Sequence, residues 1–388
     1  MNKSRKLADH FSYIDRALDL ELLLRTKSHF LFGPRQTGKS SLVRHSLPAI
    51  KLYNLLDSST YLTLSRNPKQ IAQELTPKSR IVVIDEVQRL PELLNEVHLL
   101  IEERGIKFLL TGSSARKLRR GGVNLLGGRA RTRYLHPLTF RELGDQFDLG
   151  RALTHGLLPS IYFSDDPRAD LHAYAGSYLQ EEIVSEGATR NVPAFTRFLR
   201  VAALCNATIV NFTNVANDAQ VPRTTVYEYF DILRDTMIIH ELPAWRKSTK
   251  RKPLASSKYY FFDIGVAGFL QNREFRPGTP EYGEAFETFM VHELIAWRDY
   301  RSDAALSYWR STSGFEVDLI LDDHTAIEFK AKPNLSANDF KSLRAIAEEN
   351  KLKRFICVSL EENRRTVGKI DILPWKEFLS ALWDGEFS

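Results

Sequence analysis

A run of residues near the start of the chain combines glycines, a lysine and hydroxyl side chains in one loop. Glycine at each end lets the backbone turn tightly, so that successive N–H groups can surround an oligophosphate. The lysine would reach the β- and γ-phosphates, and the first serine after it would ligate Mg²⁺. The predicted binding residues, which follow an apolar run at 29–32, are Gly33, Pro34, Arg35, Gln36, Thr37, Gly38, Lys39, Ser40 and Ser41.

Two carboxylates follow a second apolar run further along the chain. The β-branched stretch 81–84 is typical of a strand buried on both faces, and Asp85 and Glu86 come directly after it. Asp85 would hold Mg²⁺, and Glu86 would orient or deprotonate the water that attacks the γ-phosphate. An acidic pair alone is more often a solvated strand end, but downstream of the phosphate loop it predicts the metal-binding partner of that loop.

Hydroxyl and guanidinium groups offer two further contacts to a nucleotide. Ser113 or Ser114, after the apolar run 107–112, would sense the γ-phosphate, or the pair would instead cap the next helix. In the basic stretch 116–133, Arg129 follows two glycines and is the predicted arginine finger toward a neighbouring subunit's nucleotide. A solvated basic surface is the alternative.

The C-terminal part carries another group of acidic and basic residues. Asp318 and Glu328 are separated by nine residues, enough for a hairpin, and Lys330 lies two positions after Glu328 on the same strand face. Asp318 and Glu328 would hold a metal, Lys330 would stabilise the nucleophile or the phosphorane, and Glu287 would complete the site from a helix. Lys332 continues the same face. The pattern resembles the restriction-endonuclease-like nucleases, and the alternatives are a polar sheet face or an inactivated nuclease fold.

Length and composition bound the class of protein. At 388 residues with 43% hydrophobic and 26% charged residues, two or three soluble domains are expected. Two cysteines exclude a disulfide framework, and no apolar stretch predicts a signal core or a membrane span, so we expect a cytoplasmic protein. A net charge of +6 is compatible with nucleic acid as a partner.

Strands and helices alternate through the first third of the chain, and this order predicts an α/β fold. We expect a helix over 12–28, strands at 29–32, 51–56, 81–84 and 107–114, and helices at 68–75 and 91–104. The expected architecture is a P-loop parallel sheet with helices on both faces. Residues 139–187 are predicted to form a helical lid, with Asp166-Pro167 as a helix start.

The middle of the chain has a pattern typical of a helix-turn-helix with a wing. Helical segments at 195–204, 214–219 and 223–233 are followed by two apolar segments, 237–242 and 258–262, around a basic loop. Hydroxyls and positive charges would then follow a duplex backbone, which makes DNA the expected partner. A protein-packing winged helix with a solvated loop is the alternative. The residues are Arg223, Thr224, Thr225, Lys247, Lys250, Arg251 and Lys252.

These motifs together resemble the large bacterial and archaeal family of AAA-type ATPases with a C-terminal domain of unknown function. The resemblance rests on 33–40, 81–88, Pro91, 110–114, 128–129, 136–143, 156–159, 259–265 and 328–330. It implies an ATP- and Mg²⁺-binding ATPase core at 1–135, a helical lid at 136–190, a winged helix at 191–275 and a restriction-endonuclease-like PD-(D/E)xK domain at 276–388.

The first functional hypothesis is an ATPase that binds DNA and cleaves it, or whose C-terminal fold once did. The second is a nucleotide-controlled switch that binds protein partners and carries an inactive nuclease-like domain. A phosphotransferase fits less well, because Glu86 suits water activation. The arginine finger predicts a nucleotide-dependent homo-oligomer.

Overall fold

The computed structural model describes residues 13–116, 118, 126–178 and 191–387. It divides into two compact units. Unit 1 comprises Met1–Leu138, Glu142–Asp145 and Leu158–Asp165, and unit 2 comprises Thr139–Arg141, Gln146–Leu157 and Asp166–Ser388. Within the described ranges no helix has the length and apolar character needed to cross a membrane. The predicted lid residues 179–187, and most of the predicted basic cluster at 116–120, lie outside the described residues.

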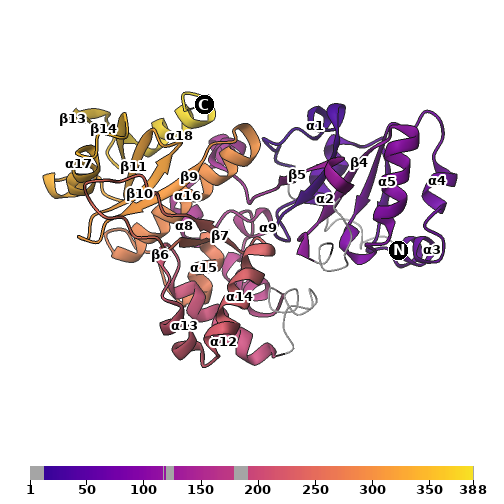
Figure 1. Cartoon of the computed structure of the whole chain (residues 1–388), viewed down its shortest axis with the longest axis horizontal. Coiled ribbons are helices and arrows are strands. Elements are labelled where there is room, and N and C mark those ends of the chain that lie inside the picture. The colour runs from indigo at the N-terminus through magenta and orange to yellow at the C-terminus, as the bar shows by residue number, and fades with distance from the viewer. Residues whose placement is uncertain (1–12, 117, 119–125, 179–190, 388) are drawn as a thin grey trace. The chain divides into compact units, whose positions relative to one another are not determined.

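Unit 1 is built on a five-stranded parallel sheet flanked by helices, which confirms the predicted fold class (Figure 1). The strand order is β2-β3-β4-β1-β5, so β3, β4 and β1 are neighbours. Their carboxyl ends meet at one edge, where ligands bind in open α/β sheets. The strands are β1 (Ser28–Phe32), β2 (Lys51–Asn54), β3 (Ile81–Asp85), β4 (Lys107–Gly112) and β5 (Ala130–Tyr134).

Three details of unit 1 differ from expectation. The first helix begins only after Asp19, whose carboxylate accepts a hydrogen bond from Leu22 N at 2.9 Å. Helix α3 was not predicted, because its serines and threonines are weak helix formers, and Asp57 caps it. Strand β5 was not predicted because its arginines resemble a solvated loop. The helices are α1 (Leu20–Thr26), α2 (Lys39–Ser46), α3 (Ser58–Arg66), α4 (Gln70–Glu74), η1 (Val87–Arg89), α5 (Leu93–Arg104), η2 (Leu126–Gly128) and α9 (Pro159–Tyr162).

Unit 2 begins with helices and a three-stranded antiparallel sheet in the order β6-β8-β7. Its strands are β6 (Thr208–Ile209), β7 (Ile239–Leu242) and β8 (Lys258–Phe261). Helices α13 and α14 follow one another across a short turn, where Gln220 has φ 54°. Helices α7 and η3 each contain residues of both units. The helices described between residues 140 and 271, apart from α9 of unit 1, are α7 (Phe140–Leu143), η3 (Gly144–Gln146), α8 (Leu149–His155), α10 (Pro167–Ala173), η4 (Tyr174–Tyr178), α12 (Val192–Leu204), α13 (Phe212–Ala219), α14 (Arg223–Asp235) and α15 (Ile264–Gln271).

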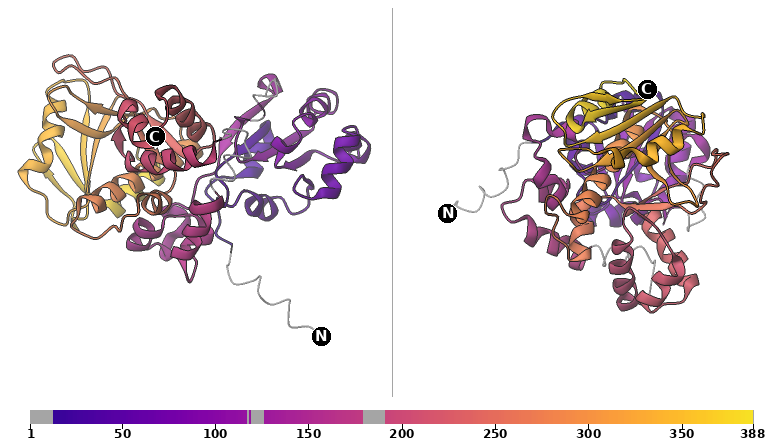
Figure 2. Two further views of the ribbon diagram at one scale, coloured as in Figure 1. Left: turned by 90° about the horizontal axis from the view of Figure 1, so that it is seen from below. Right: turned by 90° about the vertical axis from the view of Figure 1, so that its left-hand side faces the viewer.

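The C-terminal part of unit 2 holds a six-stranded mixed sheet in the order β13-β14-β12-β11-β10-β9. Its strands, orange to yellow, lie side by side in Figure 2. The expected hairpin is present: β10 and β11 are antiparallel with Leu321 opposite Thr325. The elements are α16 (Pro280–Arg301), β9 (Leu306–Arg310), β10 (Glu316–Leu321), β11 (Thr325–Lys330), η5 (Ala337–Phe340), α17 (Lys341–Ala347), β12 (Arg354–Ser359), β13 (Arg365–Val367), β14 (Ile370–Pro374) and α18 (Trp375–Trp383).

Two glycines of unit 2 allow helices α8 and α15 to pack closely. A Cβ at Gly156 would overlap the carboxylate of Asp263, and one at Gly265 would overlap His155 O. Asp263 caps α15 through Val266 N at 3.0 Å and accepts from Leu157 N at 2.6 Å. Both glycines are therefore required by the close approach of the two helices.

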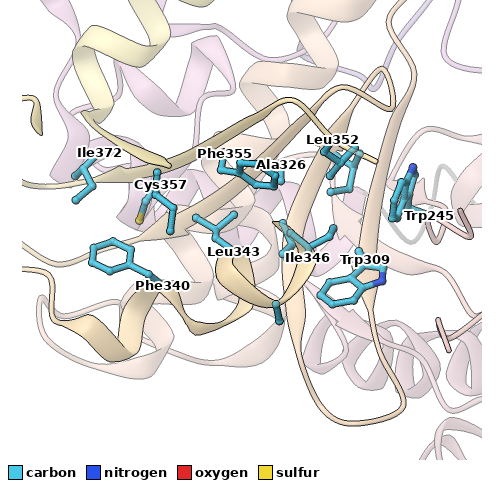
Figure 3. Close-up of a cluster of buried hydrophobic side chains, with 14 residues drawn as sticks. Trp245, Trp309, Ala326, Phe340, Leu343, Ile346, Leu352, Phe355, Cys357 and Ile372 are labelled. Atoms are coloured by element: carbon cyan, nitrogen blue, oxygen red, sulfur yellow. The ribbon is translucent and has the colours of Figure 1, made fainter. Parts of the chain in front are cut away.

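The basic loop between β7 and β8, the predicted wing, packs against the C-terminal sheet, while Lys247, Lys250 and Lys252 remain exposed. Ala244 and Pro253 form β-bridges to Tyr308 and Ser311 on the β9 side of that sheet. Trp245 is buried in the same hydrophobic cluster as Trp309, with Leu352 and Ile346 nearby (Figure 3). The buried tryptophan therefore anchors this charged loop to the C-terminal sheet.

That loop also finds acidic partners in the C-terminal part. Lys247 Nζ lies 2.7 Å from Asp323 Oδ2, and Arg251 Nη2 lies 2.6 Å from Glu348 Oε2. The Glu349 carboxylate accepts from the backbone N–H groups of residues 249, 250 and 251 at 2.7 to 2.9 Å. Two of the predicted DNA-contacting side chains, Lys247 and Arg251, are thus engaged within the chain.

Candidate functional site

The phosphate loop lies between β1 and α2, as its residue types predict. Gly38 has φ 94°, the left-handed conformation that favours glycine, and α2 begins at Lys39. Thr37 Oγ1 donates to Pro34 O at 2.8 Å, which closes the turn. Lys39 Nζ donates to Gly33 O at 2.7 Å and Pro34 O at 3.0 Å. The loop thus presents a helix N-terminus and a lysine at one place, the combination that binds phosphate.

Asp85 and Ser40 meet at the expected metal position. Ser40 Oγ donates to Asp85 Oδ2 at 2.9 Å, and Thr111 Oγ1 donates to the other carboxylate oxygen. Asp85 is buried, and a buried carboxylate beside a hydroxyl provides the oxygen ligands that Mg²⁺ prefers. These residues fit an Mg²⁺ ion bound together with a nucleoside triphosphate.

Gln88 connects Glu86 to Ser113. Its Nε2 donates to Glu86 Oε2 and lies 3.3 Å from Ser113 Oγ. The carboxylate accepts hydrogen bonds only, which fixes the orientation of the amide. A Cβ at Gly112 would overlap Gln88 Oε1, so glycine leaves room for this side chain. The sequence predicts no role for Gln88 beyond its place in the family motif 81–88, because its contact with Glu86 depends on the tertiary fold.

The two serines after β4 have different contacts. Ser113 is buried beside Gln88, whereas Ser114 Oγ accepts from Arg116 N at 3.3 Å, a local capping contact. The predicted finger, Arg129, lies just before β5 and pairs with Glu102 of α5. It is partly exposed, and its proposed role toward a neighbouring subunit stays a prediction.

A pocket of about 280 Å³ adjoins the phosphate loop within unit 1. Arg16 is one of its lining residues, and its buried guanidinium donates to Thr37 O at 2.6 Å and pairs with Glu142 at 3.0 Å. The remaining wall is largely apolar or aromatic, so it fits a flat heterocycle better than a charged group. The lining residues are Tyr13, Ile14, Arg16, Gly38, Ser41, Leu138, Pro159, Ser160 and Phe163.

In unit 2, the β10–β11 hairpin brings Asp318, Glu328 and Lys330 together as predicted. Asp318 Oδ2 accepts from Phe329 N at 2.8 Å, and Lys330 Nζ lies 2.5 Å from Glu328 Oε1. Glu328 Oε2 is buried and has no hydrogen-bond partner among the described residues. Lys332 instead pairs with Asp339 at 2.6 Å, so it is not directed to Glu328.

Glu287 is held by residues from the middle of the chain. Its Oε1 accepts from Tyr260 OH at 2.7 Å and lies 3.1 Å from Lys258 Nζ. Lys258 also pairs with Glu316. Sequence reasoning placed Glu287 on the expected helix but missed Lys258, because an isolated lysine at a strand start carries no local signal of a distant carboxylate.

Burial and mutual repulsion perturb these carboxyls. Burial, together with the charges of Glu287 and Glu328, raises the pKa of Asp318 well above its ordinary range. Burial also raises the pKa of Glu328 to about 7, although Lys330 opposes the shift. Burial disfavours the charge of Lys330, but Glu328 and Asp318 raise its pKa overall. Groups perturbed in this way are typical of functional sites.

Glu287, Asp318 and Lys330 line a cavity of about 540 Å³. No group of three or more His, Cys, Asp or Glu in the described ranges is arranged to hold a metal ion. Mg²⁺ is nevertheless often bound by only one or two carboxylates, with water completing its shell. The buried, unpartnered Glu328 Oε2 and the neighbouring Asp318 fit that mode. The cavity is lined by Glu284, Glu287, Asp318, Phe329, Lys330 and Lys332, with residues 206–208, 278–280, 283 and 331.

The exposed face of α14 is mixed in charge. Arg223 and Thr224 are exposed, but Arg223 Nη2 donates to Tyr227 OH at 2.8 Å. Arg234 pairs with Asp231 at 2.7 Å and with Glu241 at 3.0 Å. Of the predicted DNA-contacting residues, Arg223, Thr224, Lys247, Lys250 and Lys252 are exposed, Lys247 while paired with Asp323, and DNA contact stays a prediction.

Three protein families match consecutive parts of the chain. Residues 25–144 match a family described as AAA domain. Residues 146–276 match one described as domain of unknown function (DUF8612), and residues 282–378 match another, domain of unknown function (DUF4143). The match to an AAA domain covers the sheet and phosphate loop of unit 1 and supports ATP binding and hydrolysis.

Relatives and a solved structure add little functional information. Uncharacterized proteins of Mycobacterium tuberculosis and Mycobacterium bovis are each 25% identical over 345 residues, covering 86% of this chain and 76% of the relative. One of Haemophilus influenzae is 22% identical over 303 residues, covering 70% and 74%. A signal transduction ATPase of Pyrococcus horikoshii with a tetratricopeptide repeat sensor is 15% identical, covering 74% of this chain and 47% of that one. Its TM-score of 0.26 is too low to establish a shared fold.

Proposed function

We propose that this chain, in which an AAA-type P-loop ATPase domain is followed by a C-terminal domain of unknown function, hydrolyses ATP and cleaves DNA with Mg²⁺. The observation that carries the second part is the convergence of Asp318, Glu328 and Lys330 on the β10–β11 hairpin. Two acidic groups and a lysine beside a polar cavity suit cleavage of a phosphodiester bond. The contacts of Lys39, Ser40 and Asp85 support the first part.

ATP hydrolysis assigns each residue of unit 1 a distinct task. Lys39 would leave the carbonyls of Gly33 and Pro34 for the β- and γ-phosphates, and Ser40 and Asp85 would hold Mg²⁺, which neutralises phosphate charge when bound. Glu86 would accept a proton from the attacking water, with Gln88 fixing its carboxylate. The apolar pocket beside Ser41 is suited to the nucleobase.

DNA cleavage would use the hairpin and the adjoining cavity. Asp318 and Glu328 would hold Mg²⁺, which supplies Lewis acidity and an acidified water when bound. Lys330, already 2.5 Å from Glu328, would place its ammonium next to the scissile phosphate and stabilise the charge that develops there. Glu287 would add a third carboxylate from α16.

A second candidate is a nucleotide-controlled switch that binds proteins and retains the C-terminal fold for recognition. The observation that favours it is the engagement of the basic loop 243–257 by Asp323, Glu348 and Glu349. A loop held in this way offers fewer charges to a duplex. The arginine-finger prediction at Arg129 allows nucleotide-dependent self-assembly in either case.

The test is cleavage of labelled linear, circular and branched DNA with Mg²⁺ or Mn²⁺, with and without ATP. Wild type is compared with Glu328→Ala, Lys39→Ala and the matched control Glu362→Ala, whose carboxylate is exposed. Cleavage that disappears in Glu328→Ala but persists in Glu362→Ala would establish the nuclease, and an additional loss of cleavage in Lys39→Ala would show that ATP drives it. ATP hydrolysis without cleavage of any substrate would favour the switch.

A further inference from the structure

A buried ammonium group lies among the carboxylates of the C-terminal site. Lys258 begins strand β8 and is 2% exposed. Its Nζ lies 3.1 Å from Glu287 Oε1, contacts Glu316 Oε1 and lies 5.5 Å from the centre of the Tyr308 ring. Lysine is almost never fully buried unless it is paired, so these contacts account for its place in the interior.

The balance of charge in the site depends on this residue. The acidic members are Glu287, Glu316, Asp318 and Glu328, and Lys330 is paired directly with Glu328. Arg310 reaches Glu316 at 3.0 Å from the exposed side. Among the described residues, Lys258 is the cation that pairs with Glu287. Its removal would leave Glu287 beside Asp318 without that counter-ion.

We propose that Lys258 is a positioning residue that acts as a built-in counter-ion, competing with a divalent cation for the Glu287 carboxylate. The inference rests on the proposed function, in which these carboxylates hold Mg²⁺. A cation that uses Glu287 has to share it with Lys258 Nζ or displace that group. Because Lys258 belongs to β8, metal loading of the C-terminal site depends on a strand from the middle of the chain.

This role differs from a purely structural one in the sign of its effect. If Lys258 only supported packing, its loss would weaken metal binding or leave it unchanged as the site loosened. If it competes for Glu287, loss of its charge makes the site more negative and strengthens binding of a dication. Tyr260, which donates to the same carboxylate oxygen, keeps Glu287 in place in either case.

The experiment titrates the full chain with Mn²⁺, without nucleotide, and follows free Mn²⁺ by electron paramagnetic resonance. Wild type is compared with Lys258→Met and Lys258→Gln, with charge-preserving Lys258→Arg, and with Lys351→Met as an exposed-lysine control. Circular dichroism and tryptophan fluorescence identify the variants that remain folded. Lys258→Gln keeps a hydrogen-bond donor and serves if methionine prevents folding.

We expect the neutral variants to bind Mn²⁺ about tenfold more tightly or better, since one neighbouring charge shifts ionic equilibria by about that much. Lys258→Arg and Lys351→Met should match wild type, and adding Glu287→Gln to Lys258→Met should abolish the gain. An unchanged or weaker affinity in a folded neutral variant would overturn the counter-ion role. If no protein binds Mn²⁺, wild type included, the proposed metal site itself is wrong.

Discussion

Replacing Glu328 with glutamine removes a carboxyl group whose protonation depends on folding. Burial raises the pKa of Glu328 from an ordinary 4.5 to about 7. The folded chain then holds this proton more tightly than the unfolded chain. The contribution of Glu328 to the free energy of unfolding is therefore fully present below the unfolded pKa of 4.5 and is lost as the pH rises to the folded pKa of about 7. At about 1.4 kcal/mol per pKa unit, the full change is about 3 kcal/mol. Glutamine does not titrate, so Glu328→Gln should lack this dependence.

The assay is urea unfolding in EDTA at several pH values, followed by tryptophan fluorescence. All five tryptophans belong to unit 2, which also contains Glu328, so the signal reports on that unit. Loss of the ion pair with Lys330 changes the unfolding free energy of the variant by an amount that is unrelated to the proton. The informative quantity is therefore how the difference in unfolding free energy between variant and wild type changes with pH. The unfolding free energy of Glu328→Gln relative to wild type should increase by about 3 kcal/mol between about pH 4.5 and 8.

A difference that stays constant over this range, or decreases, would refute the reasoning. It would mean that Lys330 keeps Glu328 ionised throughout, so that desolvation is not the dominant effect. Glu362→Gln, which replaces an exposed carboxyl of the same unit, is the matched control.

Three further outcomes follow from contacts described above. Gln88→Ala should lower kcat for ATP hydrolysis about tenfold to a hundredfold with little change in ATP affinity, because it removes a hydrogen bond to a charged group. Gln70→Ala on α4 is the control. Unchanged turnover in Gln88→Ala would exclude the positioning role. Gly112→Ala should lower turnover in the same way, measured in the same assay, since its Cβ would displace Gln88; turnover equal to wild type would show that the side chain finds another place. Glu349→Gln should weaken docking of residues 249–251 by about 1–3 kcal/mol and speed trypsin cleavage after Lys250 and Arg251; cleavage as slow as in wild type would mean that Trp245 suffices as anchor.

Chemistry that lies within one local stretch could be predicted from the sequence. The phosphate loop, the Asp85–Glu86 strand end and the hairpin that joins Asp318 to Glu328 each depend on neighbouring residues and on standard strand and turn geometry. In the hairpin, Asp322 and Asp323 take the left-handed conformation, which aspartate tolerates, and this sets the return of the chain. The positions of these residues therefore follow from local rules.

Contacts between distant segments could not be predicted in the same way. Lys247 and Arg251 are charged residues in a loop, a pattern typical of solvent exposure, and their partners Asp323 and Glu348 are far along the chain. The same holds for Lys258 and Glu287, whose pairing requires β8 to lie against α16. Single-sequence reasoning contains no signal for such pairings, because lysine and glutamate occur on most surfaces.

The docked loop has a consequence for how this protein can be divided. Strand β9 is an edge strand of the six-stranded sheet, and the bridges from Ala244 and Pro253 cover part of that edge. The opposite edge strand, β13, is only three residues long and begins with Arg365. Short edge strands that carry a charge resist pairing with strands of other chains. A fragment cut between the two families of unknown function, near residue 280, would uncover β9 and Trp309 together. Such a fragment of this chain is therefore expected to aggregate through the uncovered edge strand.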